Sequence, residues 1–224
     1  MYVTLSTDDQ TGGAAPRISR PCVCARETQI RAGNYLFYEG DEVSWLYQVT
    51  AGVLRQTRLL ENGRRQVIAF GYPGDVVGFP ANGCHHTDCD ALVDTRLQPY
   101  RKSLLEHPEK DVELHGELLQ AALGEISAMQ DHFMMLGRKS ASERVASFLT
   151  VLAGRVGRCH DGVCKVDLPM RRADIADFLG LTTETVSRTL TQMRKSGIIK
   201  IENIHSIVVL KPAALTSLSQ GGKG

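Results

Sequence analysis

Glu184 and Arg188, whose side chains carry complementary hydrogen-bonding groups, stand four positions apart in the sequence. In a helix this spacing places both side chains on one face. An arginine guanidinium can donate two bonds to O6 and N7 of guanine, and a carboxylate can accept a bond from the amino group of cytosine. The pair therefore has the chemistry to recognise a G·C base pair. The same spacing also fits an ordinary surface salt bridge, which is worth about 0.3 kcal/mol.

The residues around this pair predict two helices joined by a tight turn. Residues 172–179 form a short amphipathic pattern, Gly180 supplies the turn, and Thr182 is a residue type that often caps the start of a helix. Two helices joined by a short turn with glycine are typical of a helix-turn-helix. The apolar positions that would form the shared core are Ile175, Phe178, Leu179, Leu181, Val186, Leu190 and Met193.

A β-hairpin is predicted directly after the second helix. Residues 198–201 and 205–210 are apolar runs, and Glu202–Asn203 provides a turn between them. This hairpin would make the motif a winged helix-turn-helix. We expect the contacts to DNA to come from Thr182, Thr183, Glu184, Ser187, Arg188, Arg194 and Lys195.

The charges of the chain are distributed unevenly. The net charge is only +1, but residues 1–137 carry 12 Lys+Arg against 18 Asp+Glu, whereas residues 138–224 carry 14 against 7. The predicted helix-turn-helix thus lies in the basic part, where clustered cations favour phosphate binding through counterion release. A basic segment is also compatible with a merely solvated surface.

Composition excludes several classes of protein. The hydrophobic content of 42% indicates a globular chain, and no uninterrupted apolar stretch approaches the ~18 residues of a membrane span. The first twenty residues lack the apolar core of a secretory signal, so we expect a cytoplasmic protein whose cysteines are thiols or ligands rather than structural disulfides. No nucleophile–base pair, phosphate loop or suitably placed pair of carboxylates points to an enzyme.

Residues 27–107 have the pattern of a small antiparallel β-domain, and residues 1–26 before them are expected to form a flexible arm. Short apolar runs, spaced about ten residues apart, alternate with glycines, as in a sandwich or jelly roll. Asn62–Gly63 predicts a hairpin, because both residue types tolerate positive φ. The predicted strands lie at residues 35–38, 45–50, 53–59 and 66–70.

Residues 108–137 predict one long helix with an apolar heptad repeat. A seam sustained over about four heptads favours pairing with a second copy of the chain over packing against its own domain, although a long core helix is the alternative. Gly137 ends this helix, and Ser140 with Glu143 matches a capping box that starts the next one, in a C-terminal domain of residues 138–224. The predicted dimer interface comprises Val112, Leu119, Ile126, Met129 and Phe133.

The cysteines offer candidate metal or redox sites. Cys84-His85-His86-x-x-Cys89 places four possible ligands within six residues, and Cys159 and Cys164 flank a four-residue loop. Such groups are able to bind a metal or to form a redox-sensitive pair. Neither motif has a partner set at a recognised zinc spacing, so the favoured interpretation is polar surface loops with free thiols.

The order of β-roll, long helix and helix-turn-helix resembles the CRP/FNR family of bacterial transcription regulators. The resemblance covers residues 30–215 and is carried by Gly74-Asp75-Val76-Val77-Gly78-Phe79 and by the segment Leu179–Arg188. It implies an α+β fold with an N-terminal antiparallel β-roll, or jelly roll, of the cyclic-nucleotide-binding type, a long dimerisation helix and a C-terminal winged helix-turn-helix. It also implies a homodimer that binds palindromic double-stranded DNA and contacts RNA polymerase.

The pattern Glu184-x-x-Ser187-Arg188 is similar to that of the FNR and FixK branches of this family. The half-site of these branches is TTGA-like and contains one G·C pair. Relatives there activate genes for microaerobic respiration, denitrification or nitrogen fixation, so the resemblance implies an activator of such genes.

The family's cofactor motifs are missing. Cyclic-nucleotide binders carry an Arg-Ser/Thr-Ala segment where this chain has Asp88 and Asp90, whose charges would repel a phosphate. FNR-type iron–sulfur sensors use three N-terminal cysteines and one in the roll, where this chain has only Cys22, Cys24 and, in the roll, Gln98. The FixK-like branch, active without an obligatory cofactor, fits best. The alternative is a ligand- or redox-gated sensor based on an iron–sulfur cluster, haem or thiols.

Overall fold

The structure is a computed structural model that describes residue 18 and residues 26–222. These residues belong to two compact units that divide within one long helix, between Met129 and Gln130. The predicted flexible arm lies outside the described residues, apart from Ile18 and Arg26.

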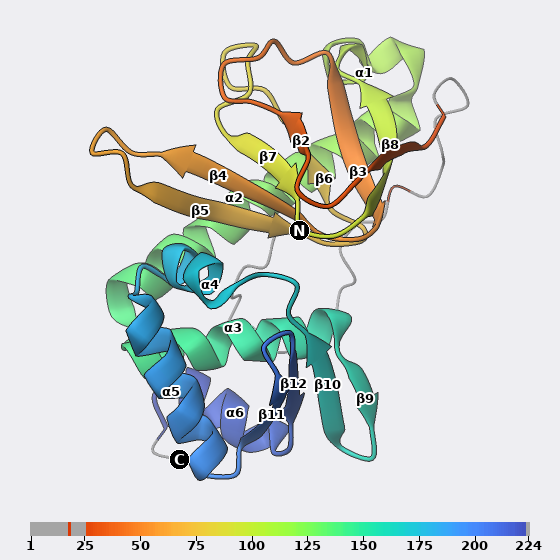
Figure 1. Ribbon diagram of the computed structural model, residues 1–224. Coiled ribbons are helices and arrows are strands. Elements are labelled where there is room, and N and C mark those ends of the chain that lie inside the picture. Colours follow the sequence, from red (N-terminus) through yellow and green to blue (C-terminus); the bar gives the residue numbers. More distant parts are fainter. Residues whose placement is uncertain (1–17, 19–25, 223–224) are drawn as a thin grey trace. The chain divides into compact units, whose positions relative to one another are not determined.

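The described part of the first unit contains a β-roll of two four-stranded antiparallel sheets (Figure 1). The strand order is β1-β8-β3-β6 in one sheet and β2-β7-β4-β5 in the other. The predicted antiparallel roll is therefore confirmed, and the four predicted strands correspond to β2 to β5. The strands are β1 (Thr28–Ile30), β2 (Tyr35–Phe37), β3 (Trp45–Ala51), β4 (Leu54–Leu59), β5 (Arg65–Gly71), β6 (Val76–Val77), β7 (Asp88–Ala91) and β8 (Thr95–Arg101).

Strands β4 and β5 form the hairpin that Asn62–Gly63 predicted. The backbone N–H of Leu60 donates to the carbonyl of Arg64 at 2.8 Å, which closes the turn. Gly63 has a φ of 76°, a conformation that glycine adopts without a steric penalty. Asn62 acts differently from the expectation, because its side chain accepts a bond from the Arg64 N–H at 3.0 Å and only the glycine needs a positive φ.

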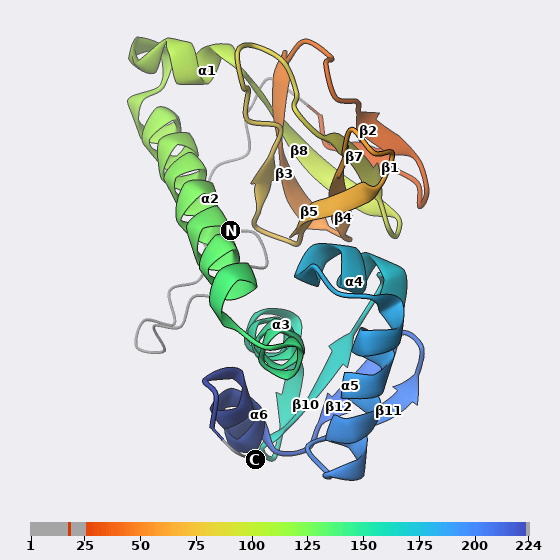
Figure 2. The ribbon, with the colours of Figure 1, turned by 90° about the vertical axis from the view of Figure 1, so that its left-hand side faces the viewer.

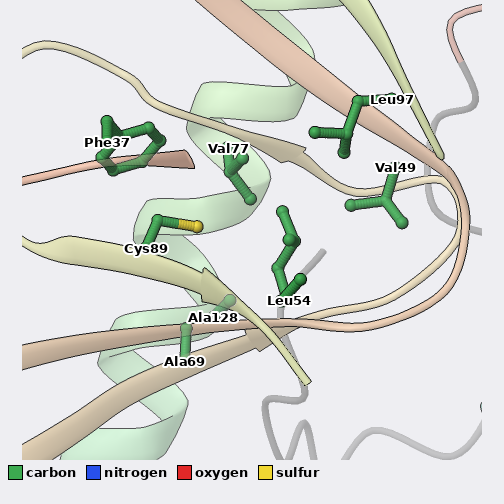
Figure 3. Close-up of a cluster of buried hydrophobic side chains, with 9 residues drawn as sticks. Phe37, Val49, Leu54, Ala69, Val77, Cys89, Leu97 and Ala128 are labelled. Atoms are coloured by element: carbon green, nitrogen blue, oxygen red, sulfur yellow. The ribbon is translucent and has the colours of Figure 1, made fainter. Parts of the chain in front are cut away.

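The core of the roll is built from apolar side chains that point inward from both sheets, and Ala128 is added by the long helix that follows (Figure 3). Figure 3 shows the thiol of Cys89 pointing into this cluster, near Phe37 and Val77. Removing such side chains from water is the main stabilising contribution to the roll. The cluster comprises Phe37, Val49, Leu54, Ala69, Val77, Cys89, Ala91, Leu97 and Ala128.

After the roll come α1 (Ser103–Glu106), the 3₁₀ turn η1 (Pro108–Lys110) and the long helix α2 (Val112–Arg138). The predicted helix is confirmed and ends one residue later than expected. One face of its first half packs on the roll, with Leu114, Leu118 and Ala121 buried. The expectation that this helix would not pack against its own domain was therefore wrong, because α2 carries a second apolar face that does pack; its pairing with a second copy stays a prediction.

The second unit places helices around a four-stranded antiparallel sheet of order β11-β12-β10-β9, here called the wing sheet. Figure 2 views α3 nearly end-on, with α6 on one side and β10 and α5 on the other. After the end of α2, its elements are α3 (Ala141–Val156), β9 (Arg158–His160), β10 (Val163–Asp167), α4 (Arg172–Leu179), α5 (Thr183–Lys195), β11 (Ile199–Asn203), β12 (Ser206–Val209) and α6 (Pro212–Ser219).

The start of α3 confirms the predicted capping box. The Ser140 hydroxyl accepts a bond from the Glu143 N–H at 3.4 Å, and the Glu143 carboxylate accepts from the Ser140 N–H at 2.9 Å. These two bonds satisfy helix N–H groups that have no partner inside the helix. Within the part of the chain that the structure describes, no helix combines the length and hydropathy that a membrane span requires.

Two parts of the second unit differ from the sequence interpretation. Residues 159–164 were expected to be a polar surface loop, but residues 161 and 162 form the turn of the β9–β10 hairpin and the other four belong to its strands. Asp161 and Gly162 make this turn possible with positive φ values of 50° and 77°. Helix α6 was not predicted, because it is short and begins at Pro212.

Candidate nucleic-acid interface

Helices α4 and α5 form the predicted helix-turn-helix. Gly180 ends α4 with a φ of 61°, a left-handed conformation that favours glycine. The N–H of Leu181 returns to the carbonyl of Ala176 at 2.9 Å, which closes the turn. The predicted core positions are buried except Leu181, which is partly exposed. The turn is therefore fixed by backbone geometry and by burial on both sides of it.

Helix α5 begins as predicted, with Thr182 as its cap. The Thr182 hydroxyl accepts a bond from the Thr185 N–H at 3.1 Å. The residues proposed to contact DNA are all exposed, namely Thr182, Thr183, Glu184, Ser187, Arg188, Arg194 and Lys195. Their exposure leaves this face of α5 available to a partner.

Glu184 and Arg188 are bonded to each other in the structure, through Arg188 Nη2 and Glu184 Oε1. Their side chains are nevertheless 80% and 73% exposed. An ion pair in this setting contributes little to stability, because water screens the charges. Breaking this ion pair therefore costs little free energy. Each side chain can then bond to the edge of a base instead of to the other.

Sequence reasoning missed one polar residue on the same face of α5. Thr191 follows Glu184 by seven positions, and Lys195 follows Arg188 by seven, so these four side chains line one stripe of the helix. The Thr191 hydroxyl donates to the Ser187 carbonyl at 2.8 Å. The heptad spacing was the available signal. Lys195 lies at the far end of this stripe, where a cation suits phosphate contact.

Strands β11 and β12 form the predicted wing, but its turn lies at residues 204–205 instead of at Glu202–Asn203, which belong to β11. This turn is attached to the segment before α4. The Leu168 N–H donates to the His205 carbonyl at 2.8 Å, and the His205 ring Nδ1 lies 3.2 Å from the Leu168 carbonyl. Lys165 of β10 and Glu202 of β11 add an ion pair at 2.6 Å. The wing is thus held in a defined relation to the helix-turn-helix.

Arg144 of α3 connects the end of α2 to the helix-turn-helix. Its guanidinium donates to the carbonyls of Leu136 at 2.7 Å, Lys139 at 2.9 Å and Leu179 at 3.0 Å. Leu179 directly precedes the glycine of the turn. One half-buried side chain therefore links α2, α3 and α4. Sequence reasoning could not find this link, because backbone carbonyls carry no sequence signal.

His132 of α2 lies next to this link. Its ring stacks on Phe178 of α4 with a centroid distance of 4.3 Å, and its Nδ1 is buried without a hydrogen-bond partner. Burial lowers the pKa of His132 to about 4, a bond to the backbone of Phe178 opposes this shift, and the charge of Arg144 adds to it. At neutral pH the ring is therefore uncharged.

The structure separates the four candidate ligands of the roll. Cys89 is fully buried, and burial raises the pKa of its thiol. His85 stacks on Phe37 with a centroid distance of 3.6 Å, and burial lowers its pKa. Cys84 is partly exposed and His86 exposed. Among residue 18 and residues 26–222, no group of three or more His, Cys, Asp or Glu side chains is placed to hold a metal ion.

The remaining cysteines divide into two cases. Cys22 and Cys24 lie outside the described residues. Cys159 and Cys164 are joined by a disulfide bond, so the expectation of free thiols at these two positions was wrong. The physical reason is the β9–β10 register, which places the two residues directly opposite each other.

Comparison with known proteins matches both units to described domains. Residues 27–103 match the model of the cyclic nucleotide-binding domain, and residues 143–218 match that of the Crp-like helix-turn-helix domain. The nitrogen fixation regulation protein FixK of Rhizobium meliloti is 38% identical over 188 residues, which cover 84% of this chain and 84% of the relative. The transcriptional activator protein FnrL of Cereibacter sphaeroides is 33% identical over residues that cover 83% of this chain and 77% of the relative.

Among solved structures, FixK2 from Bradyrhizobium japonicum is similar, with a TM-score of 0.78 and 37% sequence identity. The match covers 86% of this chain and 96% of the FixK2 chain. A β-roll joined by a long helix to a winged helix-turn-helix defines a class of DNA-binding transcription regulators rather than enzymes. Within that class, the chain belongs to the CRP/FNR family, on its FixK-like branch.

Proposed function

We propose that the protein binds a palindromic DNA site as a homodimer and activates transcription there. The observation that carries this proposal is the exposed Glu184–Arg188 pair near the start of α5, in a helix-turn-helix whose core is buried. In such motifs the N-terminal residues of the second helix contact base edges in the major groove. Arg188 would contact guanine and Glu184 the paired cytosine of a TTGA-type half-site.

A direct test compares two DNA duplexes of equal length and composition, one with two TTGA-type half-sites and one scrambled. The half-sites are centred about 10 base pairs apart, one helical turn, to match a two-fold dimer. Fluorescence anisotropy at several salt concentrations should show preference for the palindrome at every concentration, together with a common salt slope from phosphate contacts. Equal affinity for both duplexes would contradict sequence-specific recognition.

The dimer proposal rests on an exposed apolar stripe along α2. Val112 and Phe133 are each 75% exposed and Ile126 is 53% exposed, which is unusual for such large apolar side chains. Leu123 extends the stripe beyond the predicted positions. Covering it with the same stripe of a second copy would give the two-fold partner that a palindrome requires.

Oligomeric state and DNA affinity should change together when the stripe receives a charge. Ile126→Glu should give a monomer in analytical ultracentrifugation and weak binding to the palindrome. Gln120→Glu adds the same charge at an exposed position of α2 outside the stripe and should leave the dimer intact. A dimeric Ile126→Glu protein would contradict this interface.

The roll residues do not fit the phosphate of a cyclic nucleotide. Asp90 occupies the segment where the family's cyclic-nucleotide binders carry arginine, and it is buried in a two-point ion pair with Arg55, at 3.0 and 2.9 Å. Thr87 is also buried and donates to Gln56 at 3.1 Å.

The roll also lacks the iron–sulfur ligand of the FNR branch. Gln98, at the position of the FNR roll cysteine, is an amide buried in β8. We therefore propose a regulator that acts without either ligand. An absorption spectrum of protein purified without oxygen should lack charge-transfer and Soret bands.

Activation further requires contact with RNA polymerase in the cytoplasm, where the DNA lies. The name of one relative, nitrogen fixation regulation protein FixK, points to genes for nitrogen fixation as targets, and the family resemblance adds genes for microaerobic respiration or denitrification. Transcription in vitro from a promoter carrying the palindrome should rise when the protein is added to purified polymerase. Unchanged or reduced transcription, with the palindrome occupied, would contradict an activating role at that promoter.

A further inference from the structure

The β9–β10 hairpin carries a cross-strand disulfide that the function above does not use. Cys159 and Cys164 are direct partners in the strand register, with their Cα atoms 4.0 Å apart. Cys159 is exposed, whereas Cys164 is only 8% exposed. A small molecule in solution therefore approaches this bond from the Cys159 side.

The bond attaches an edge strand to the sheet of the helix-turn-helix. In the described residues, β9 has β10 as its sheet neighbour, and β10 pairs on its other side with β12 of the wing. All three residues of β9 are exposed. Strand β10 leads within a few residues into α4. The disulfide thus lies between the surface and the elements that position α5.

Little else holds β9 in place. Its ladder with β10 has three residue pairs, and the ion pair between Arg158 and Asp167 is 70% and 59% exposed, so it contributes little. Cys164 lies at the margin of the core, which is formed mainly by other residues, such as Phe148, Phe178 and Leu190. Because the loop closed by the bond is short, the bond also restrains the unfolded chain less than a long-range one would. Reduction should release β9 while the unit stays folded.

The compartment of bacterial DNA favours exchange at such a bond. Thiol pools there keep most cysteines reduced, and the disulfides that do form are usually transient or redox-sensing. A bond that the core does not need, and that is accessible from solvent, can open and close without unfolding the domain.

We propose that Cys159 and Cys164 form a reversible thiol–disulfide site that exchanges with small thiols of the glutathione class. A small thiolate attacks the Cys159 sulfur, the Cys159–Cys164 bond breaks, and Cys164 leaves as a thiolate that takes up a proton. A second small thiolate then attacks the sulfur of the first, the mixed disulfide breaks, and Cys159 leaves as a thiolate that takes up a proton. Two small thiols are thereby oxidised to one disulfide, and the protein disulfide is reduced to two thiols. The reverse sequence closes the bond.

The sequence allows the redox state of the Cys159–Cys164 pair to be measured on a single peptide. Cleavage by trypsin after Arg158 and Lys165 releases one peptide that contains Cys159, Cys164 and no other cysteine. The full-length protein is equilibrated with mixtures of oxidised and reduced glutathione, quenched with an alkylating agent and digested. Mass spectrometry should find this peptide shifting from the unmodified disulfide to the doubly alkylated dithiol as the reduced fraction rises, and back again.

Hydrogen exchange on the same samples tests the structural consequence. Reduction should remove the protection of the β9 amides and leave that of α4 and α5 unchanged. Cys159→Ser/Cys164→Ser should behave like the reduced protein in every mixture. Cys84→Ser, which removes a free thiol in the other unit, should respond like the parent.

Three results would overturn the proposal. The peptide could stay a disulfide in excess reduced glutathione, stay a dithiol in excess oxidised glutathione, or change state without any effect on β9. None of these measurements involves DNA, so they fail or succeed independently of the proposed DNA recognition.

Discussion

Each unit of the protein contains an arginine paired with a carboxylate, and the two pairs lie in opposite environments. In the roll, the side chains of Arg55 and Asp90 are 16% and 6% exposed and are joined by two bonds. On α5, the side chains of Arg188 and Glu184 are 73% and 80% exposed. Burial makes the first pair part of the folded structure, because neither charge can be left without the other. Exposure leaves the second pair free to exchange partners, which is what recognition of DNA needs.

The largest effect should come from breaking the buried pair. Asp90→Ala leaves Arg55 without its carboxylate partner inside the roll and should lower the free energy of unfolding by about 3 kcal/mol. Urea denaturation checks this value. A loss below about 1 kcal/mol, the level of a surface pair, would erase the contrast between the two pairs.

Arg144 is an intermediate case, since it is half-buried and bonds to carbonyls instead of a carboxylate. Arg144→Met keeps much of the side-chain volume but leaves three carbonyls without their donor, and should cost about 2 kcal/mol in unfolding free energy. It should also weaken binding to the palindrome, because the helix-turn-helix loses its link to α2. Wild-type DNA affinity in a destabilised variant would limit Arg144 to a role in stability.

Acid should destabilise the second unit through His132. Its folded pKa of about 4 lies below the ordinary value of 6.5, so the unfolded state binds the proton more readily. The resulting stability is fully present above pH 6.5 and is lost as the pH falls toward 4, with a loss of about 2 kcal/mol at pH 5. Urea denaturation at pH 7.5 and pH 5 measures this loss, which should be smaller in His132→Gln. An equal pH dependence in both proteins would assign the effect to other groups.

The smallest effect on stability is expected for the exposed pair. Glu184→Ala should change the unfolding free energy by less than about 0.5 kcal/mol. The same variant should lose discrimination at the cytosine of the half-site, as measured by anisotropy. A large loss of stability with unchanged discrimination would make this pair structural after all.

The helix-turn-helix could be predicted in detail because its signals are local. Gly180 at the turn, Thr182 at the cap and the apolar spacing of Val186, Leu190 and Met193 each determine structure within a few residues. The same is true of the capping box at Ser140. Local consistency of this kind leaves few alternative conformations.

The role of α2 could not be decided from its sequence, because the helix carries two apolar series of the same period. Val112, Leu119, Ile126 and Phe133 recur every seven residues and are exposed. A second series with the same spacing, Leu114, Ala121, Ala128 and Met135, is buried. Period alone predicts a face for each series but not which face meets the chain's own core.

The disulfide and the Arg144 link were missed for a different reason. A redox-sensitive pair was one alternative, but free thiols were favoured because no zinc spacing was present, and the pairing depends on the register of two strands that were not predicted. The partners of Arg144 are carbonyls brought together by three helices. Both features depend on tertiary structure, which spacing along the chain does not encode.

The central claim is that Arg188 recognises the guanine of the half-site, and a thermodynamic cycle tests it most directly. Binding of the parent protein and of Arg188→Ala is measured on the palindrome and on a duplex in which the G·C pair of each half-site is replaced by A·T. The parent should lose about 1 to 3 kcal/mol per half-site on this replacement, and the variant should lose almost nothing. Equal losses for both proteins would show that Arg188 contributes to binding without recognising that base pair.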